Sequence, residues 1–156
     1  MIVKAYLLGV HRVYLYIQPF SLLSLPKEDT MKVNTLVVVA AVLALLFGLA
    51  FFLIPAQFIT IYGLKLEPLG QFMARYFGSA LLGVAALNWF ARNQVSRVVI
   101  LADFVLSVAG LVVGFWQAIS GLGNSLVWTT VIIYLFLALG FGYYSFLNQE
   151  SIQLTA

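Results

Sequence analysis

The sequence predicts an all-α membrane protein, folded as a compact antiparallel bundle of four transmembrane helices. Of its 156 residues, 63% are hydrophobic and only 8% are charged, a composition far outside that of soluble domains. A soluble chain of this length could not cover so much apolar surface with polar residues. The apolar residues also fall into four stretches that are each long enough to cross a bilayer, and the mean hydropathy is +1.06.

The first two predicted spans cover residues 33–54 and 70–91. The first is almost wholly aliphatic or aromatic and ends before Pro55. Its helix would rise about 33 Å, which matches a hydrocarbon core of about 30 Å. The second is expected to begin after Glu67 and Pro68. Proline is favoured in the first turn of a helix, and an acidic side chain is favoured at the positive end of the helix dipole.

The last two predicted spans cover residues 98–120 and 126–147. Asp103 is the charged residue inside the third span, and a glycine-rich turn separates it from the fourth. The connections at residues 93–97 and 121–125 are too short to cross a bilayer, so the second, third and fourth helices should form antiparallel hairpins. Small or polar residues recur along each helix, which predicts that all four pack around a common centre.

Two segments outside the spans have separate predictions. Residues 56–69 are mostly apolar and are expected to form a short interfacial helix or a re-entrant turn. Residues 1–30 precede the domain formed by residues 31–156. Their apolar run is too short to span a bilayer, and no signal-peptide cleavage site follows it. They are interpreted as an interfacial extension, or as a misassigned start with Met31 as the initiator.

Basic residues predict the orientation. With four spans, one side of the membrane carries six of them: Lys4, Arg12, Lys27, Lys32, Arg92 and Arg97. The other side carries Lys65, with Arg75 close to it. Lysine and arginine favour the cytoplasmic side of short loops, so both termini are expected there.

The absence of certain residue types and motifs from the sequence argues against several classes of function. It has no cysteine, which excludes disulfides, thiolate metal sites and cysteine nucleophiles. Its one histidine, His11, cannot form a two-histidine haem site or a histidine-rich metal site in one subunit. No phosphate-binding loop, nucleophile elbow or zinc-protease motif occurs, and no basic run is available for nucleic acid. We therefore expect a non-enzymatic protein with no metal, no cofactor and no nucleic-acid partner.

The third span carries a stripe of polar and small residues on one helical face. The stripe has steps of four, three, four and three: Asp103, Ser107, Gly110, Gly114 and Gln117. Small residues let helix backbones approach closely, so four glycines of the second and third spans are interpreted as packing residues: Gly78, Gly83, Gly110 and Gly114. Packing within one chain is favoured over a dimer seam or a path for a solute, which stay open as alternatives.

Arg75 and Asp103 place charges inside predicted spans, where ionisable residues often have a function. About 14 Å of bilayer depth separates them, so they are not expected to pair. Arg75 is expected to reach outward toward Glu67 or toward carbonyl groups of the loop. Asp103 is level with four polar side chains that suit it as partners: Asn88, Tyr143, Tyr144 and Ser145. The candidate functional residues are Asp103, Arg75, Ser107, Glu67 and Asn88.

Short motifs recur along the first two spans and the segment between them: Ile54-Pro55-Ala56-Gln57-Phe58, Tyr62-Gly63, Ala74-Arg75, Gly78, Leu82-Gly83 and Trp89. Over residues 35–147 this pattern resembles a family of small uncharacterised bacterial inner-membrane proteins with four predicted spans. The resemblance implies a location in the bacterial inner (plasma) membrane and places Arg75 in a recurrent motif. It carries no activity over to this sequence.

The leading functional prediction is a non-enzymatic accessory or structural subunit, embedded in the lipid bilayer as a homo-oligomer or within a larger membrane complex. The alternative is a small oligomeric transporter or channel that uses Asp103 for proton or cation coupling. A weaker alternative is a lipid- or quinone-binding subunit that uses the aromatic residues of the interface. Water reaching the stripe of the third span would favour a solute path, and a dry stripe would favour the accessory role.

Overall fold

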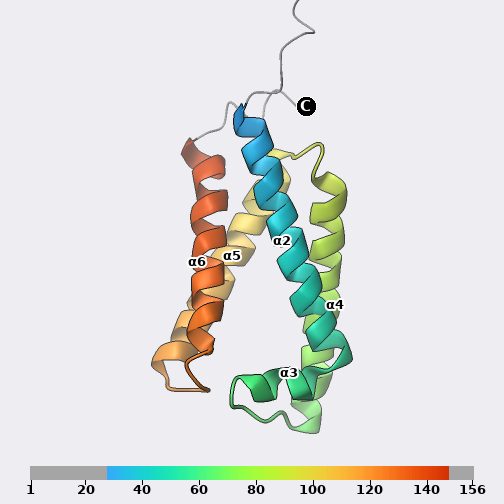
Figure 1. Ribbon diagram of the computed structural model, residues 1–156, viewed down its shortest axis with the longest axis vertical. Helices are drawn as coiled ribbons and strands as arrows, with labels where there is room; N and C mark the ends of the chain where they lie inside the picture. Colours follow the sequence, from blue (N-terminus) through green and yellow to red (C-terminus); the bar gives the residue numbers. More distant parts are fainter. Residues whose placement is uncertain (1–27, 148–156) are drawn as a thin grey trace, which may run out of the picture.

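The regular elements of the described part of the chain are all helical. This computed structural model describes residues 28–147. It contains α2 (Glu28–Leu53), α3 (Pro55–Ile61), α4 (Pro68–Ala91), α5 (Arg97–Ile119), α6 (Val127–Gly142) and η1 (Tyr143–Leu147), a turn of π-helix that continues α6 (Figure 1). The predicted all-α class is confirmed for these residues. The predicted extension 1–30 lies almost wholly outside them.

Three described segments are long and apolar enough to cross a membrane: Lys32–Leu53, Arg97–Ile119 and Val127–Leu147. They correspond to the first, third and fourth predicted spans. The second predicted span is α4, a helix of 24 residues, which is long enough but less apolar. Gln71, Arg75 and Asn88 interrupt its hydrophobic sequence. A fourth crossing by α4 therefore stays a prediction.

Local residues explain where the helices begin and end. Proline begins both α3 and α4. In the first turn of a helix a backbone N–H has no partner within the helix, so the N–H that proline lacks is not needed there. Ser96 caps α5, since its Oγ accepts a hydrogen bond from the backbone N–H of Val99. The chain reverses after α5 at Gly121 and Gly123, which both have positive φ and adopt it without steric cost. The short helix expected within residues 56–69 corresponds to α3.

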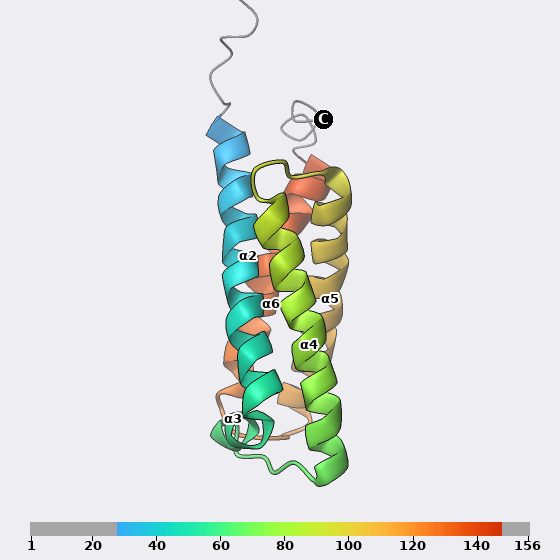
Figure 2. The ribbon, with the colours of Figure 1, turned by 90° about the vertical axis from the view of Figure 1, so that its right-hand side faces the viewer.

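The four long helices form two hairpins. α2 lies along α4, and α5 lies along α6, whereas α4 and α5 run apart from the loop that joins them (Figure 1, Figure 2). The second and third predicted spans are thus antiparallel, but they do not pack along their length, and the predicted packing of all four helices around one centre is corrected. The physical reason is a close approach at Gly78, where a Cβ would lie 2.6 Å from the backbone nitrogen of Phe52. The absence of a side chain at Gly78 thus lets α4 pack closely on α2, and α4 packs there and not along α5.

The two hairpins meet around a buried apolar core at one end of the molecule, here called the core end. Its most buried side chains come from α2, the loop before α5, α5 itself and α6: Val33, Val37, Val95, Ile100 and Phe141. Away from this core, each long helix exposes large apolar side chains, such as Leu46, Phe90, Val105 and Leu139. Apolar surface of this extent has to be covered by lipid or by another protein.

At the opposite end the two hairpins lie farther apart. α3 and the turn at residues 120–126 connect them there, and this region is called the turn end (Figure 1). Asn124 donates two hydrogen bonds across this junction. Its backbone N–H donates to the carbonyl of Tyr62 at 2.9 Å, and its Nδ2 donates to the carbonyl of Ile61 at 2.8 Å. Different kinds of contact therefore connect the hairpins at their two ends.

Candidate functional site

Polar side chains gather at the core end, where α4 and α5 leave the short loop between them. Asn88 lies in the last turn of α4, and Asp103 lies in the second turn of α5. The antiparallel arrangement brings these two positions to one level. Ser107 follows one turn after Asp103. The exposed fractions of these side chains are 2%, 6% and 3% for Asn88, Asp103 and Ser107, so the structure brings three of the five candidate residues into a buried polar cluster.

The Asp103 carboxylate is only partly satisfied by hydrogen bonds. Asn88 Nδ2 donates to Asp103 Oδ1 at 3.1 Å, which links α4 to α5. The second oxygen, Oδ2, is buried and has no hydrogen-bond partner in the described part of the chain. Ser107 Oγ donates to the backbone carbonyl of Asp103 at 2.7 Å, so this hydroxyl does not serve the carboxylate. A buried acceptor without a donor is costly, and each such group calls for an explanation.

Aromatic contacts hold the neighbouring part of α5 against the end of α6. The rings of Phe104 and Phe146 are 5.3 Å apart between centroids and nearly perpendicular. A Cβ on Gly142 would lie 3.1 Å from Cε2 of Phe104. Because Phe104 follows Asp103 directly, these contacts position the carboxylate at the junction of both hairpins. Of the four expected partners of Asp103, Asn88 is confirmed, whereas Tyr143, Tyr144 and Ser145 give no hydrogen bond to its second carboxylate oxygen, and Tyr143 is exposed.

The other two charged candidates lie apart from this cluster. Arg75 is exposed near the start of α4, and helical rise places it about 20 Å from Asn88 along the axis. Glu67 precedes α4 as its N-cap residue, is exposed, and makes no capping hydrogen bond through its side chain. Within residues 28–147 neither Arg75 nor Glu67 forms an ion pair. Arg75 and Asp103 do not pair, as expected, and Arg75 forms no ion pair with Glu67, the first of the two partners expected for it.

The four predicted packing glycines differ in their surroundings. A Cβ on Gly110 would overlap the ring of Tyr134, and a Cβ on Gly114 would touch Val131 at 3.6 Å. This pair therefore packs α5 on α6 within one chain. Gly78 packs α4 on α2 as described above. Gly83 is exposed, and outside the backbone of its own helix no described atom lies within 4 Å of the position that its Cβ would take, so it lies in no interface among residues 28–147.

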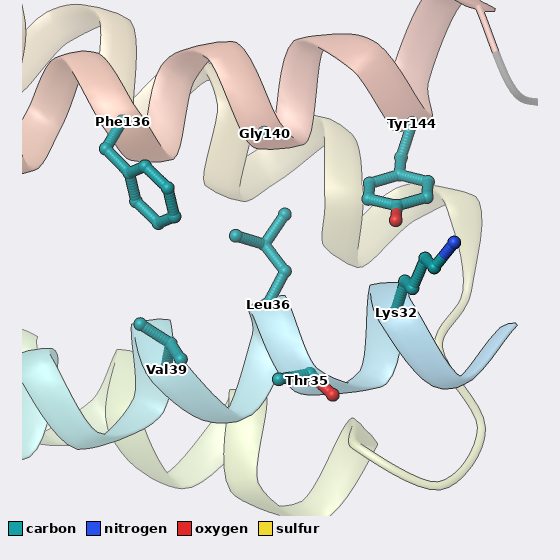
Figure 3. A pocket seen from close by; sticks show the side chains of 7 residues that line it. All are labelled: Lys32, Thr35, Leu36, Val39, Phe136, Gly140 and Tyr144. Carbon is teal, nitrogen blue, oxygen red and sulfur yellow. The ribbon is translucent and has the colours of Figure 1, made fainter. Parts of the chain in front are cut away.

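A further site was missed by the sequence analysis. A groove of about 280 Å³ runs between α2 and α6 and is lined by Lys32, Thr35, Leu36, Val39, Phe136, Gly140 and Tyr144 (Figure 3). Its walls come from helices that lie at opposite ends of the described chain. No local motif indicates such a site, because it depends on how the two hairpins meet.

Comparisons of the chain with protein-family models, with curated proteins and with solved structures found no match. The resemblance to a family of bacterial four-span proteins therefore stays a prediction. The function has to be inferred from the residues of this chain and their arrangement.

Proposed function

We propose that this protein is a four-span protein of the bacterial inner membrane that serves as a non-enzymatic subunit of a larger membrane assembly. The outer face of α4 would be its docking surface for another protein. One observation carries this proposal: a single outward stripe of α4 consists of polar and small residues, beside the large apolar side chains that α4 exposes elsewhere.

The α4 outer face consists of Arg75, Ser79, Gly83 and Ala86, which follow one another at steps of four, four and three. All four are exposed. The opposite, buried face of α4 carries Gly78, Leu81, Ala85 and Asn88. Small residues on a membrane helix allow a second helix to approach closely, and an arginine at membrane depth favours contact with protein or with the interface over contact with lipid chains. This surface therefore suits a partner helix better than it suits lipid.

The same interpretation explains why α4 is less apolar than the other three long helices. A helix covered by α2 on one face and by another protein on the other face meets little lipid, so it needs fewer apolar residues to remain in the bilayer. Its 24 residues are enough for a hydrocarbon core of about 30 Å. A fourth crossing by α4 within an assembly is thus compatible with its lower hydropathy.

Basic residues support the orientation with the core end in the cytoplasm. Lys32, Arg92 and Arg97 all lie at that end, at the start of α2 and around the loop between α4 and α5. The guanidinium carbon of Arg92 lies 4.2 Å from the ring centroid of Trp89, and such basic and aromatic pairs are typical of a membrane interface. Lys65 lies in the connection between α3 and α4, at the turn end.

Site-specific photo-cross-linking in intact cells tests the docking surface. A benzophenone amino acid replaces Gly83, where the space beside the helix is open. A matched control replaces Val112, which is 63% exposed on α5. We expect protein adducts from position 83 and only lipid adducts from position 112. Two differently tagged copies of the chain distinguish a second copy from a different partner. Only lipid adducts at both positions would disprove docking through the α4 outer face.

The buried oxygen of Asp103 favours a second candidate function, proton- or cation-coupled transport. A proton or a small cation at Oδ2 would satisfy the acceptor that lacks a partner among the described residues. Reconstituted vesicles test this candidate with Asp103→Asn, which keeps the size of the side chain and removes its charge. Transport requires ion uptake by the wild type that this variant loses while it stays folded. Equal ion fluxes in both proteins would reject the coupling role.

A further inference from the structure

The groove between α2 and α6 changes in character along its length. Lys32 rises from α2 toward Tyr144 of η1 at one end, whereas Val39 and Phe136 flank the other end (Figure 3). Leu36 and Gly140 lie between them. The groove is thus cationic and hydroxyl-bearing at one end and hydrocarbon at the other.

The order of polar and apolar groups along the groove is the same as the order from the surface of a membrane to its interior. Lys32 is the first residue of the apolar segment Lys32–Leu53, so the cationic end of the groove lies where that segment begins. Val39 lies about 10 Å farther along α2, inside the apolar segment. A phospholipid standing in the adjacent leaflet has the same order, with its phosphate at the boundary and its acyl chains below it.

We propose that the groove binds one anionic phospholipid, with its phosphate beside Lys32 and Tyr144 and one acyl chain along Leu36, Val39 and Phe136. An ammonium group attracts the phosphate, and hydroxyl groups can donate hydrogen bonds to phosphate oxygens. Basic residues at the boundary of a membrane helix favour anionic lipids in general. The apolar walls distinguish a lipid from a soluble phosphate, because only the lipid has a chain to bury there.

The dimensions of the groove suit part of a lipid. Its volume of about 280 Å³ is close to the lower limit of about 300 Å³ for small-molecule pockets. The groove therefore takes a segment of one acyl chain and the edge of the headgroup, while the rest of the lipid stays in the bilayer. Gly140 lets Leu36 of α2 pack close to α6 at the middle of the groove, since a Cβ there would lie 3.0 Å from both methyl groups of Leu36.

Native mass spectrometry of the full chain tests this proposal with two lipids of identical acyl chains, phosphatidylglycerol and phosphatidylcholine. We expect one phosphatidylglycerol to be retained in preference to phosphatidylcholine. Lys32→Gln should weaken that retention about tenfold, because it removes a charge-assisted contact. Arg97→Gln is the matched control, since Arg97 is exposed at the same end of the molecule but does not line the groove. It should leave the retention unchanged.

A second pair of variants tests the apolar part of the groove. Val39→Phe fills it from an exposed position and should weaken retention of both lipids, whereas Val42→Phe, on the same helix outside the groove, should not. Excess inorganic phosphate should not displace the lipid. Equal retention of the two lipids by the wild type would overturn the proposal, as would an unchanged affinity in Lys32→Gln. Cross-linking from position 39 to a peptide of the same chain, in place of lipid, would show that the chain itself fills the groove and would equally overturn it.

Discussion

The core end and the turn end hold the same two hairpins together in different ways. At the core end, apolar side chains from both hairpins are buried together, and Asn88 binds Asp103 across the junction. At the turn end, the exposed residue Asn124 donates to two backbone carbonyls of α3 and the residue after it. Buried apolar area stabilises much more than an exposed hydrogen bond does. The core end therefore sets the arrangement of the hairpins, and the turn end can separate while the core end stays intact.

The largest effect is expected from a cavity at the core end. Phe141 is 1% exposed, so Phe141→Ala should lower the free energy of unfolding by about 3–5 kcal/mol. Unfolding of the full chain in detergent, followed by circular dichroism, measures this loss. The control is Phe90→Ala, because Phe90 is 82% exposed on α4 and should lose far less. Similar losses in the two variants would show that the core end does not dominate stability.

A second pair of substitutions tests how closely α2 and α4 pack within their hairpin. In Gly78→Ala the new Cβ meets the backbone of Phe52 at 2.6 Å, and backbone cannot move aside as a flexible side chain can. We expect a loss of about 1–3 kcal/mol, measured by the same unfolding experiment. Gly83→Ala adds the same methyl group where no described atom lies within 4 Å and should be neutral or slightly stabilising. A neutral Gly78→Ala would contradict a close α2–α4 contact.

The hydrogen bond between Asn88 and Asp103 should contribute less than the core. Asn88→Ala removes the donor to Oδ1, and side-chain hydrogen bonds between membrane helices average about 0.6 kcal/mol with a maximum near 1.7 kcal/mol. A double-mutant cycle with Asp103→Asn isolates the interaction, since it subtracts the separate effects of each change. Strictly additive losses would show that this hydrogen bond does not join α4 to α5.

The smallest change in stability, and the most local change in structure, is expected from Asn124→Ala. Exposed substitutions usually alter stability by less than about 0.5 kcal/mol. The chain contains no cysteine, so spin labels can be attached at chosen pairs of exposed positions. Labels at Gln57 and Leu122 should give a broader distance distribution in Asn124→Ala, whereas labels at Val98 and Leu147 should not. Equal broadening at both ends would refute the distinction between them.

Features that depend on neighbours in the sequence were predicted well. The first span was expected to end before Pro55, and α2 ends at Leu53. Pro68 indicates where α4 begins, and the glycines after α5 indicate the reversal before α6. The short loop between α4 and α5 also allowed Asn88 to be placed level with Asp103, and the structure shows their hydrogen bond. These predictions needed only helix length and loop length.

Features that depend on which helices meet were predicted less well. Gly78 and Gly83 are both small residues of α4, yet only Gly78 lies against another helix, because α4 turns that face toward α2. No periodicity within α4 distinguishes the two. The groove between α2 and α6 has the same origin, since Lys32 and Tyr144 become neighbours only after the hairpins have met. Such contacts require the tertiary arrangement.

The π-helical turn η1 makes the position of Tyr144 depend on helical register. This turn contains five residues, Tyr143–Leu147, and continues directly from α6. A π turn accommodates one residue more than an α-helical turn does. Deletion of Tyr143 would rotate the following side chains by about 100° around the axis and would move Tyr144 to the direction that Tyr143 now has, where the side chain is 50% exposed. The length of this one turn, and not only its composition, therefore selects the aromatic residue that faces α2.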